Sequence, residues 1–220
     1  MPETTDARTE ILARIRTAKP LPSDKEASRS WETIERDYKV ASDLSPREML
    51  HLLEDRLVDY DAHVFRCEPD QIAELVKRAL VQRGRQNIVI PAGLPREWLP
   101  EGFRFVEDQT LSPDDLDKLD GVLTAATLAI ADTGTVVLQS GPGQGRRAAT
   151  LVPDYQLCVL FASQIVQSVP QAMRLLESAA RLPTTMFSGP SATADIEMTR
   201  IKGVHGPRFL DVILVLDDAV

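Results

Sequence analysis

Apolar residues recur at helical spacing in two segments of the first half of the chain. Ser45 is suited to cap the first helix, Pro46 suits its first turn, and Glu48 completes a capping box. The 3.6-residue period predicts one buried stripe, formed by Met49, Leu50, Leu53, Leu57 and Val58. The same period predicts a second helix that begins at Pro69 and ends near Gly84.

Short apolar or alternating runs predict strands between and after these helices. The predicted strands span residues 61–67, 87–90, 103–107, 122–130, 135–139, 157–161, 184–187 and 209–216, and further helices span 112–119 and 170–182. Strands that alternate with helices favour an α/β protein with three layers and a mostly parallel sheet. The turn at residues 132–134 joins two strands directly, so it predicts a hairpin and some antiparallel pairing.

The start of the chain differs from the rest, and we predict a helical N-terminal arm at residues 1–44 before an α/β domain at 45–220. Residues 5–18 form a predicted helix with one apolar face. The apolar positions of that face are Ile11, Leu12 and Ile15. Residues 24–38 are mostly charged, with Trp31 as an isolated apolar residue. Either the arm is loosely attached, or it docks a partner or a second subunit through Trp31.

Composition and charge narrow the classes of protein. The chain has 220 residues, 43% of them hydrophobic, which suffices for one domain plus an extension. Its net charge of −8 argues against a binder of duplex nucleic acid, because such proteins present a basic surface. No apolar run approaches the roughly 18–20 residues of a membrane span, and the N-terminus is acidic, unlike a signal peptide. We therefore expect a cytoplasmic protein without a membrane span.

The cysteines and histidines are few. Cys67 and Cys158 lie far apart in the sequence, so they form neither a disulfide framework nor a cysteine cluster. Three histidines without a cysteine cluster also argue against a dedicated transition-metal site. We expect no metal and no cofactor in this chain, and any iron–sulfur cluster would belong to a partner protein.

Small residues gather in two stretches of the C-terminal half, where glycine lets the backbone approach a ligand and exposed N–H groups bind anions. The first stretch supplies the candidate binding residues Thr133, Gly134, Thr135, Ser140, Gly141, Gly143, Arg146 and Arg147. It is neither a dinucleotide fingerprint nor a P-loop, because Arg146 replaces the third glycine, no Gly-Lys-Ser/Thr follows, and no clear helix is expected there. Either it is a mobile hairpin tip with solvated arginines, or the two guanidinium groups grip a carboxylate or phosphate.

Asp132 stands at the end of a predicted strand, directly before Thr133 and Gly134. An aspartate at such a turn commonly accepts hydrogen bonds from backbone N–H groups two residues on, as in an Asx turn. The alternative is a catalytic carboxylate that acts as an acid/base or as a nucleophile, and Asp132 is a candidate for that role.

The second stretch supplies the candidate binding residues Ser188, Gly189, Ser191, Thr193 and Asp195 and the candidate catalytic residues Glu197 and His205. It follows a predicted strand, and open α/β sheets bind ligands beyond the carboxyl ends of their strands. If the segment is extended, Asp195 and Glu197 project from one face, whereas in a helix they diverge. His205 either acts as an acid/base near neutrality or bonds to the loop backbone. Two such stretches in one domain predict a single composite pocket.

Together these stretches resemble the LUD-domain proteins, specifically the lactate-utilisation protein C group. The motifs that carry the resemblance are residues 132–135, 140–143, 146–147, 188–191, 193–197 and 203–207, within roughly residues 61–216. The resemblance implies a fold of the NagB/ribose-5-phosphate isomerase/CoA-transferase type. It also implies a role in oxidising L-lactate to pyruvate alongside two iron–sulfur-type partner proteins.

The chain departs from this family in two places. Asp132 stands where the family usually has Glu, and its shorter side chain disfavours a nucleophilic mechanism in the manner of the CoA transferases. Residues 121–128 lack the more usual Gly-Ile-Thr-Gly-Ala-Asp pattern.

Three hypotheses about function remain. The first, which we favour, is a non-redox component of the L-lactate-oxidising system that binds a small carboxylate or organises iron–sulfur partner subunits; Arg146, Arg147 and His205 would suit an α-hydroxy acid. The second is a stand-alone isomerase, cyclo-ligase or acyl-CoA-transferase-like enzyme acting on a phosphorylated or CoA-linked substrate. The third is an assembly protein whose N-terminal arm docks a partner. The sequence leaves the identity of the ligand and the oligomeric state open.

Overall fold

The computed structural model describes residues 6–18, 22–38, 43–194, 200–202 and 205–217. The chain divides into two compact units, Met1–Tyr38 and Lys39–Val220. Within the described ranges, no helix has the length and apolar character needed to cross a membrane.

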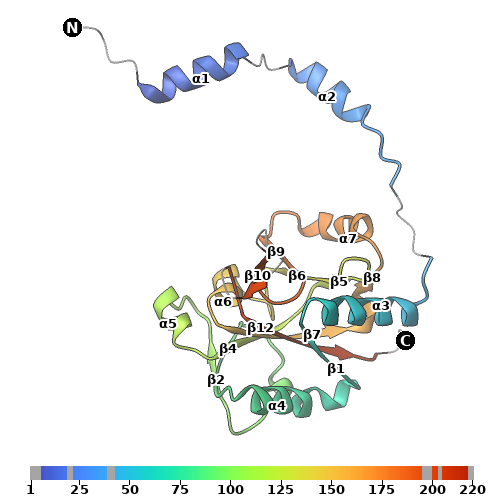
Figure 1. The fold of residues 1–220 in the computed structure, drawn as a ribbon, viewed down its shortest axis with the longest axis vertical. Coiled ribbons are helices and arrows are strands. Elements are labelled where there is room, and N and C mark those ends of the chain that lie inside the picture. The colour runs from blue at the N-terminus through green and yellow to red at the C-terminus, as the bar shows by residue number, and fades with distance from the viewer. Residues whose placement is uncertain (1–5, 19–21, 39–42, 195–199, 203–204, 218–220) are drawn as a thin grey trace. The chain divides into compact units, whose positions relative to one another are not determined.

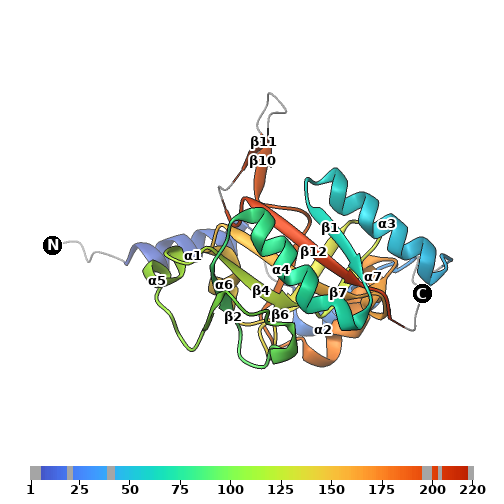
Figure 2. The same ribbon diagram turned by 90° about the horizontal axis from the view of Figure 1, so that it is seen from below.

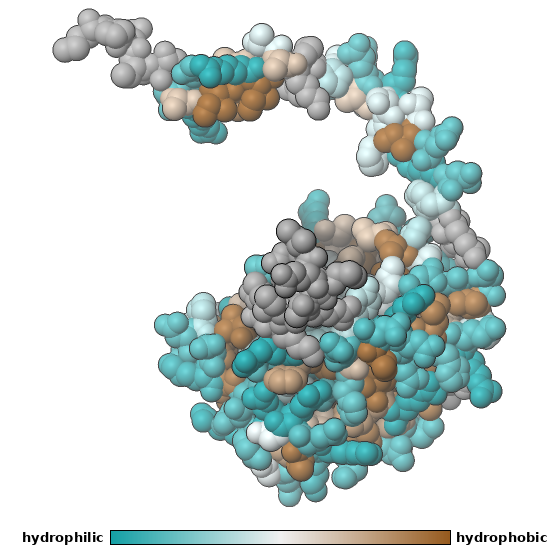
Figure 3. Space-filling model, in the orientation of Figure 1, coloured by the Kyte–Doolittle hydropathy of each residue, from teal (hydrophilic) through white to brown (hydrophobic). Residues whose placement is uncertain are grey.

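The N-terminal unit contains two helices, α1 (Ala7–Ala18) and α2 (Asp24–Glu32). α1 confirms the helix predicted for residues 5–18. Neither helix buries a residue, and Trp31 is 67% exposed. Apolar side chains lie together along one face of α1 (Figure 3). The apolar face of this unit is therefore not covered by the unit itself.

The second unit is built on a six-stranded sheet in which every neighbouring pair of strands is parallel. In spatial order, its strands are β1 (His63–Cys67), β12 (Phe209–Val215), β7 (Tyr155–Phe161), β4 (Gly121–Ala125), β2 (Asn87–Ile90) and β3 (Arg104–Glu107). α4 (Ile72–Arg83) covers one face of this sheet and α3 (Pro46–Asp59) lies on the opposite side (Figure 1). The predicted α/β class with a mostly parallel sheet is confirmed.

Local signals in the sequence set the ends of the helices. The capping box predicted for α3 is present, because Ser45 Oγ accepts a hydrogen bond from the Glu48 N–H and the Glu48 carboxylate accepts one from the Ser45 N–H. Ser23 and Glu26 form the same arrangement at the start of α2. α4 ends at Gly84, whose φ of +63° is in the left-handed region that glycine favours.

The buried face of α3 is narrower than predicted. Leu50, Leu53 and Leu57 are buried as expected. Val58 is 55% exposed, so its assignment to the buried stripe was wrong. Consecutive residues of a helix lie about 100° apart around its axis, and this rotation carries Val58 past the face that contacts the sheet.

A second, four-stranded sheet consists, in spatial order, of β8 (Ile165–Val166), β5 (Leu128–Ile130), β6 (Thr135–Gln139) and β9 (Thr184–Phe187). β6 pairs antiparallel with both β5 and β9, which confirms the hairpin predicted at residues 132–134. α7 (Val169–Leu176) packs against the outer face of this sheet through Ala172 and Leu176. The predicted helix over 170–182 was too long, since a 3-10 turn (Glu177–Ala179) follows α7.

The single strand predicted over residues 122–130 was wrong. Its first part is β4 of the large sheet and its last part is β5 of the small sheet. The chain passes from the large sheet to the small sheet between residues 126 and 127. The Ala126 N–H donates to Val159 O of β7, and the Thr127 N–H donates to Val137 O of β6. This crossing holds the two sheets together as packed layers.

The remaining elements are short. They are helices α5 (Pro113–Asp117) and α6 (Arg147–Leu151), the 3-10 turns Pro69–Gln71, Arg96–Trp98 and Ala162–Gln164, and the antiparallel pair β10 (Ala192–Ala194) and β11 (Arg200–Lys202). α5 and α6 pack over β2 and β4, where Leu116 and Ala149 meet Val89 and Val122. The β10–β11 pair stands away from the large sheet (Figure 2).

Strand β7 lies between β12 and β4 in the large sheet, and its side chains alternate between two cores. Tyr155, Leu157 and Val159 pack with α4 on one face, and Cys158 and Leu160 pack with α3 and the small sheet on the other. By the same alternation Gln156 points to the small-sheet side. Gln156 is thus a buried polar residue on this side of the sheet, beside α6.

Candidate functional site

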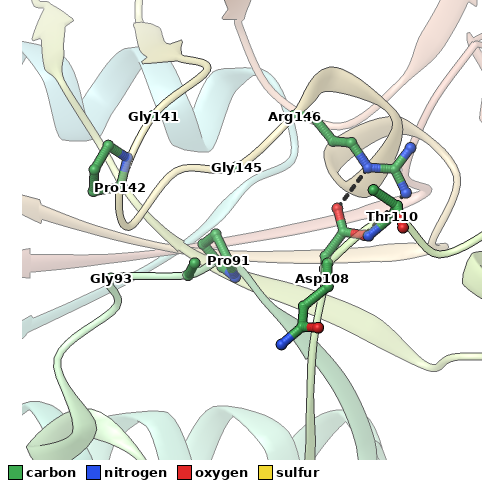
Figure 4. A pocket seen from close by; sticks show the side chains of 10 residues that line it. Pro91, Gly93, Asp108, Thr110, Gly141, Pro142, Gly145 and Arg146 are labelled. Atoms are coloured by element: carbon green, nitrogen blue, oxygen red, sulfur yellow. Dashed lines mark hydrogen bonds and ion pairs between the residues drawn. The ribbon is translucent and has the colours of Figure 1, made fainter.

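Two cavities flank the short helix α6. The first, which we call the β2–β3 pocket, has a volume of about 330 Å³. It is lined by residues 91–93, which follow β2, by residues 108–110, which follow β3, and by Gly141, Pro142, Gly145 and Arg146 (Figure 4). It therefore lies at the carboxyl ends of parallel strands, where α/β sheets usually bind ligands.

The glycine-rich loop at residues 140–145 packs tightly against the end of β2. The Gly143 N–H donates to Ala92 O, and Gly143 O accepts from the Ala125 N–H, each at 2.8 Å. Gly93 has a φ of +82°, and a Cβ atom there would come within 2.9 Å of Pro142 Cβ. The loop joins β6 to α6, so the interpretation as a hairpin tip was wrong, as was the expectation that no helix follows it.

Arg146 is engaged by a buried carboxylate on one wall of the β2–β3 pocket. Its Nε lies 2.7 Å and its Nη2 2.9 Å from the Asp108 oxygens (Figure 4). Nη2 also donates a hydrogen bond to Leu111 O. The Asp108 side chain is only 2% exposed. Burial by itself raises the pKa of Asp108, but hydrogen bonds from Arg146 and from the Leu111 and Thr110 N–H groups outweigh it and hold that pKa below its usual value. Arg146 therefore stabilises the loop after β3.

The second cavity, which we call the β9 pocket, has a volume of about 310 Å³. Its lining comprises Arg147, Thr150, Leu151, Gln156, residues 185–191, residues 205–207 and Leu210. Among the residues that the structure describes, this lining has one guanidinium, one imidazole and several hydroxyl groups, and none of them is an aspartate or a glutamate. Such a donor-rich surface favours a negatively charged ligand.

Gln156 is a buried amide in the lining of the β9 pocket. Its residue is 4% exposed, and Nε2 has no hydrogen-bond partner. Burying an amide donor without an acceptor costs about 1–3 kcal/mol. No described residue accepts a hydrogen bond from Nε2. A ligand oxygen that accepted this hydrogen bond inside the cavity would remove the cost.

The two walls of the β9 pocket are tied together through Ser191. Its Oγ accepts a hydrogen bond from the His205 N–H at 3.0 Å, and its own N–H donates to Pro207 O at 2.8 Å. Gly189, with a φ of +78°, lies so close to the end of α3 that a Cβ atom would come within 2.5 Å of Tyr60 Cβ. His205 is exposed at the rim.

Asp132 lies in the exposed turn between β5 and β6. The turn is closed by the Gly134 N–H, which donates to Ala131 O at 3.3 Å. Among the described residues the Asp132 carboxylate makes no hydrogen bond, so the Asx turn considered for it is not formed. A line of hydroxyls leads away from this turn. Thr135 Oγ1 lies 2.7 Å from Thr133 Oγ1 and 2.8 Å from Ser188 Oγ, and Ser188 lines the β9 pocket.

The prediction of one composite pocket holds only in part, because the two stretches share the β9 pocket through Arg147 while the rest of the first stretch lines the other cavity or lies outside both. Gly141 and Arg146 line the β2–β3 pocket, whereas Arg147, Ser188, Gly189, Ser191 and His205 line the β9 pocket. Two other candidates of the first stretch lie in the loop beside the β2–β3 pocket. The Ser140 N–H donates to Pro183 O, and the Gly143 N–H donates to Ala92 O. Thr193 lies in β10, and Asp195 and Glu197 lie outside the described residues.

The position predicted for the second stretch also needs correction. The strand before Ser188 is β9, an edge strand of the mixed small sheet that pairs antiparallel with β6. The β9 pocket borders Gln156 and Leu210, near the amino ends of β7 and β12, so the carboxyl-end rule does not describe it. That rule instead describes the β2–β3 pocket, whose residues 91–93 and 108–110 our reasoning did not select.

Sequence reasoning also missed Gln156 and Asp108. The signal for Gln156 was a lone amide before the apolar run of β7, and the signal for the β2–β3 pocket was the Pro91–Gly93 sequence after β2. Asp108 had no local signal, because its partner Arg146 is 38 residues away.

The described residues show no group of three or more His, Cys, Asp or Glu side chains arranged to hold a metal ion. Both cysteines are buried. Burial, and then the charges of Glu68 and Asp70, raise the pKa of the Cys67 thiol to about 11, and burial raises the pKa of Cys158 to about 12. Metal ligation needs the thiolate form, which these environments disfavour.

The fold and its cavities thus define an α/β domain with two candidate small-molecule sites. A family model described as LUD domain matches residues 96–215, and the chain belongs to this family. It is 38% identical to a Deinococcus radiodurans protein named Lactate utilization protein C, over 98% of both chains. A protein of the same name from Halalkalibacterium halodurans is 28% identical, over 84% of this chain and 86% of that protein.

A solved structure agrees with this relationship. It is described as a DUF162 family protein from Deinococcus radiodurans and matches with a TM-score of 0.69 and 36% identity. The match covers 78% of this chain and 99% of that one.

Proposed function

We propose that this chain is a non-redox component of a multi-protein system that oxidises L-lactate to pyruvate. The observation that carries the proposal is the similarity, over nearly the whole length of both chains, to a protein named Lactate utilization protein C. The protein from Halalkalibacterium halodurans that bears the same name supports it.

The β9 pocket supports a binding role within that system. Arg147, His205 and the surrounding hydroxyl groups favour a small carboxylate, since the described lining places no carboxylate of its own against it. Arg146, which we had expected to share this role, is held by Asp108 at the other cavity. Arg147 and His205 remain the candidates for contact with a hydroxy acid.

Partner subunits with iron–sulfur clusters would carry out the electron transfer in this proposal. A cluster needs several accessible thiolates, and the two cysteines of this chain are single and buried. The chain would then deliver the carboxylate to such partners or organise them, and it would work in the cytoplasm.

The test is an anaerobic purification of the tagged chain from its native host grown on L-lactate, with iron and bound proteins quantified. We expect iron-containing proteins and L-lactate-oxidising activity to elute with the tagged chain. We also expect a strain without the gene to lose growth on L-lactate while retaining growth on pyruvate.

The opposite result has a clear meaning. If the chain elutes alone and its deletion leaves growth on L-lactate unchanged, the proposed role is wrong. The stand-alone isomerase or acyl-CoA-transferase hypothesis would then be tested with CoA thioesters and sugar phosphates.

A further inference from the structure

Among its described lining residues, the β9 pocket carries one buried donor without an acceptor, the Gln156 Nε2. Gln156 enters it from β7, between Leu210 of β12 and Val122 of β4, which pair with it across the large sheet. Both neighbours are apolar and buried. An apolar residue at position 156 would match these two neighbours, so the buried amide in the cavity lining is best explained by an oxygen atom that it contacts there.

One guanidinium group faces the same cavity. Arg147 lines the β9 pocket and, within the described part of the chain, its side chain makes no ion pair or hydrogen bond. Its backbone carbonyl accepts a hydrogen bond from Thr150 Oγ1 at 3.0 Å, which fixes the start of α6 beneath the side chain. The neighbouring Arg146 is unavailable, because it is bound to Asp108.

Beside the hydroxyl groups and the His205 imidazole, part of the described lining is apolar. Leu151, Phe187 and Leu210 line the cavity together with Met186 and the two prolines of the loops. Arg147 is the one permanently charged cation among the described lining residues, so a second carboxylate or a doubly charged phosphate would be desolvated against that lining without a second permanent cation.

We propose that the β9 pocket binds a monocarboxylic acid with an apolar chain. The Gln156 Nε2 donates a hydrogen bond to a ligand oxygen, Arg147 balances the carboxylate, and Leu151, Phe187 and Leu210 contact the carbon chain. The inference rests on the proposed function and deepens it, because it names the class of acid that the site accepts and the residue that anchors it.

The experiment is calorimetric titration of the purified full-length chain with L-lactate, with the longer 2-hydroxy-4-methylpentanoate, with malate and with inorganic phosphate. We expect L-lactate to bind and the longer acid to bind more tightly, by about fourfold for each methylene that the wall covers. Malate and phosphate should bind at least tenfold more weakly than L-lactate.

Two variants separate ligand contact from folding. Gln156→Leu should weaken binding of 2-hydroxy-4-methylpentanoate at least tenfold, while its melting temperature without ligand equals or exceeds that of the wild type, because a buried donor without an acceptor has been removed. Gln139→Leu is the matched control, since the amide of this other buried glutamine does donate, to Ala179 O. It should lower the melting temperature and leave binding unchanged.

Three outcomes overturn the inference: unchanged binding by Gln156→Leu, malate or phosphate binding as tightly as L-lactate, or no binding of any monocarboxylate. Each of these leaves the purification and growth results standing, so the site and the role in L-lactate oxidation are tested separately.

Discussion

Arg146 and Arg147 are neighbours in the sequence, yet they line different cavities. Arg146 turns to the Asp108 carboxylate at the β2–β3 pocket, and Arg147 turns to the β9 pocket. The sequence identified both as anion-binding candidates because it shows residue type and spacing. It could not separate them, because the partner of Arg146 lies 38 residues away and is brought there only by the end of β3.

The two arginines should therefore respond differently to substitution. Arg146→Ala leaves the buried Asp108 carboxylate without its cation, which we expect to lower the free energy of unfolding by on the order of 3 kcal/mol. Arg147→Ala removes an exposed side chain and should change it by no more than about 0.5 kcal/mol. Urea denaturation of the two variants measures both values, and equal losses would contradict this assignment.

The Asp108–Arg146 pair also makes stability depend on pH. The folded-state pKa of Asp108 is below its unfolded value of about 3.9. Its contribution is therefore fully present above the unfolded pKa and is lost as the pH falls through the folded pKa. Relative to Asp108→Asn, the wild type should be more stable by a constant amount above about pH 5, and the difference should shrink below about pH 4. Urea midpoints measured from pH 3 to pH 7 provide the test, and a difference that persists undiminished at pH 3 would refute it.

Elements whose signals are local were predictable, and those that depend on distant partners were not. The start of α3 and the end of α4 follow from Ser45 and Gly84, because caps involve residues a few positions apart. The break between β4 and β5 follows from hydrogen bonds of Ala126 and Thr127 to two other strands. The pattern of residues 122–130 alone does not predict which strands these two N–H groups bond to. The two separate cavities escaped prediction for the same reason.

The two capping boxes offer a matched test of what an N-cap contributes. α3 packs in the core through Leu50, Leu53 and Leu57, so Ser45→Ala should lower the free energy of unfolding of the α/β unit by about 1 kcal/mol. α2 buries no residue, so Ser23→Ala should leave the unfolding transition of the α/β unit unchanged. Thermal melts compare the two variants, and a lowered melting temperature for Ser23→Ala would show that α2 contributes to the core.

At the scale of the whole molecule, the N-terminal unit and the α/β unit differ in what they bury. The unit Met1–Tyr38 leaves the apolar residues of α1 and Trp31 exposed, whereas Lys39–Val220 contains every buried core residue found in the described chain. This contrast keeps both hypotheses about the arm open for experiment, the loosely attached arm and the docking arm.

Deletion of residues 1–38 decides between them. The truncated chain should fold with an unchanged melting temperature, because the deleted unit supplies no core residue. If the arm docks a partner, the truncated chain should lose the proteins that elute with the full chain, and Trp31→Ala in the full chain should weaken the same association. Retention of all partners by the truncated chain would refute the docking hypothesis.

The position of α6 between the cavities makes the length of the preceding loop as important as its composition. Arg146 stands at the N-cap of α6 and Arg147 at its first helical position. The loop is anchored at Gly143 by its hydrogen bonds to Ala92 and Ala125. A residue added or removed between this anchor and α6 that the loop does not absorb would therefore rotate each arginine by about 100° around the helix axis. A relative that preserves both contacts must therefore conserve the number of residues between Gly143 and α6, and an alignment gap there would mark a protein in which the two cavities no longer have the same chemistry.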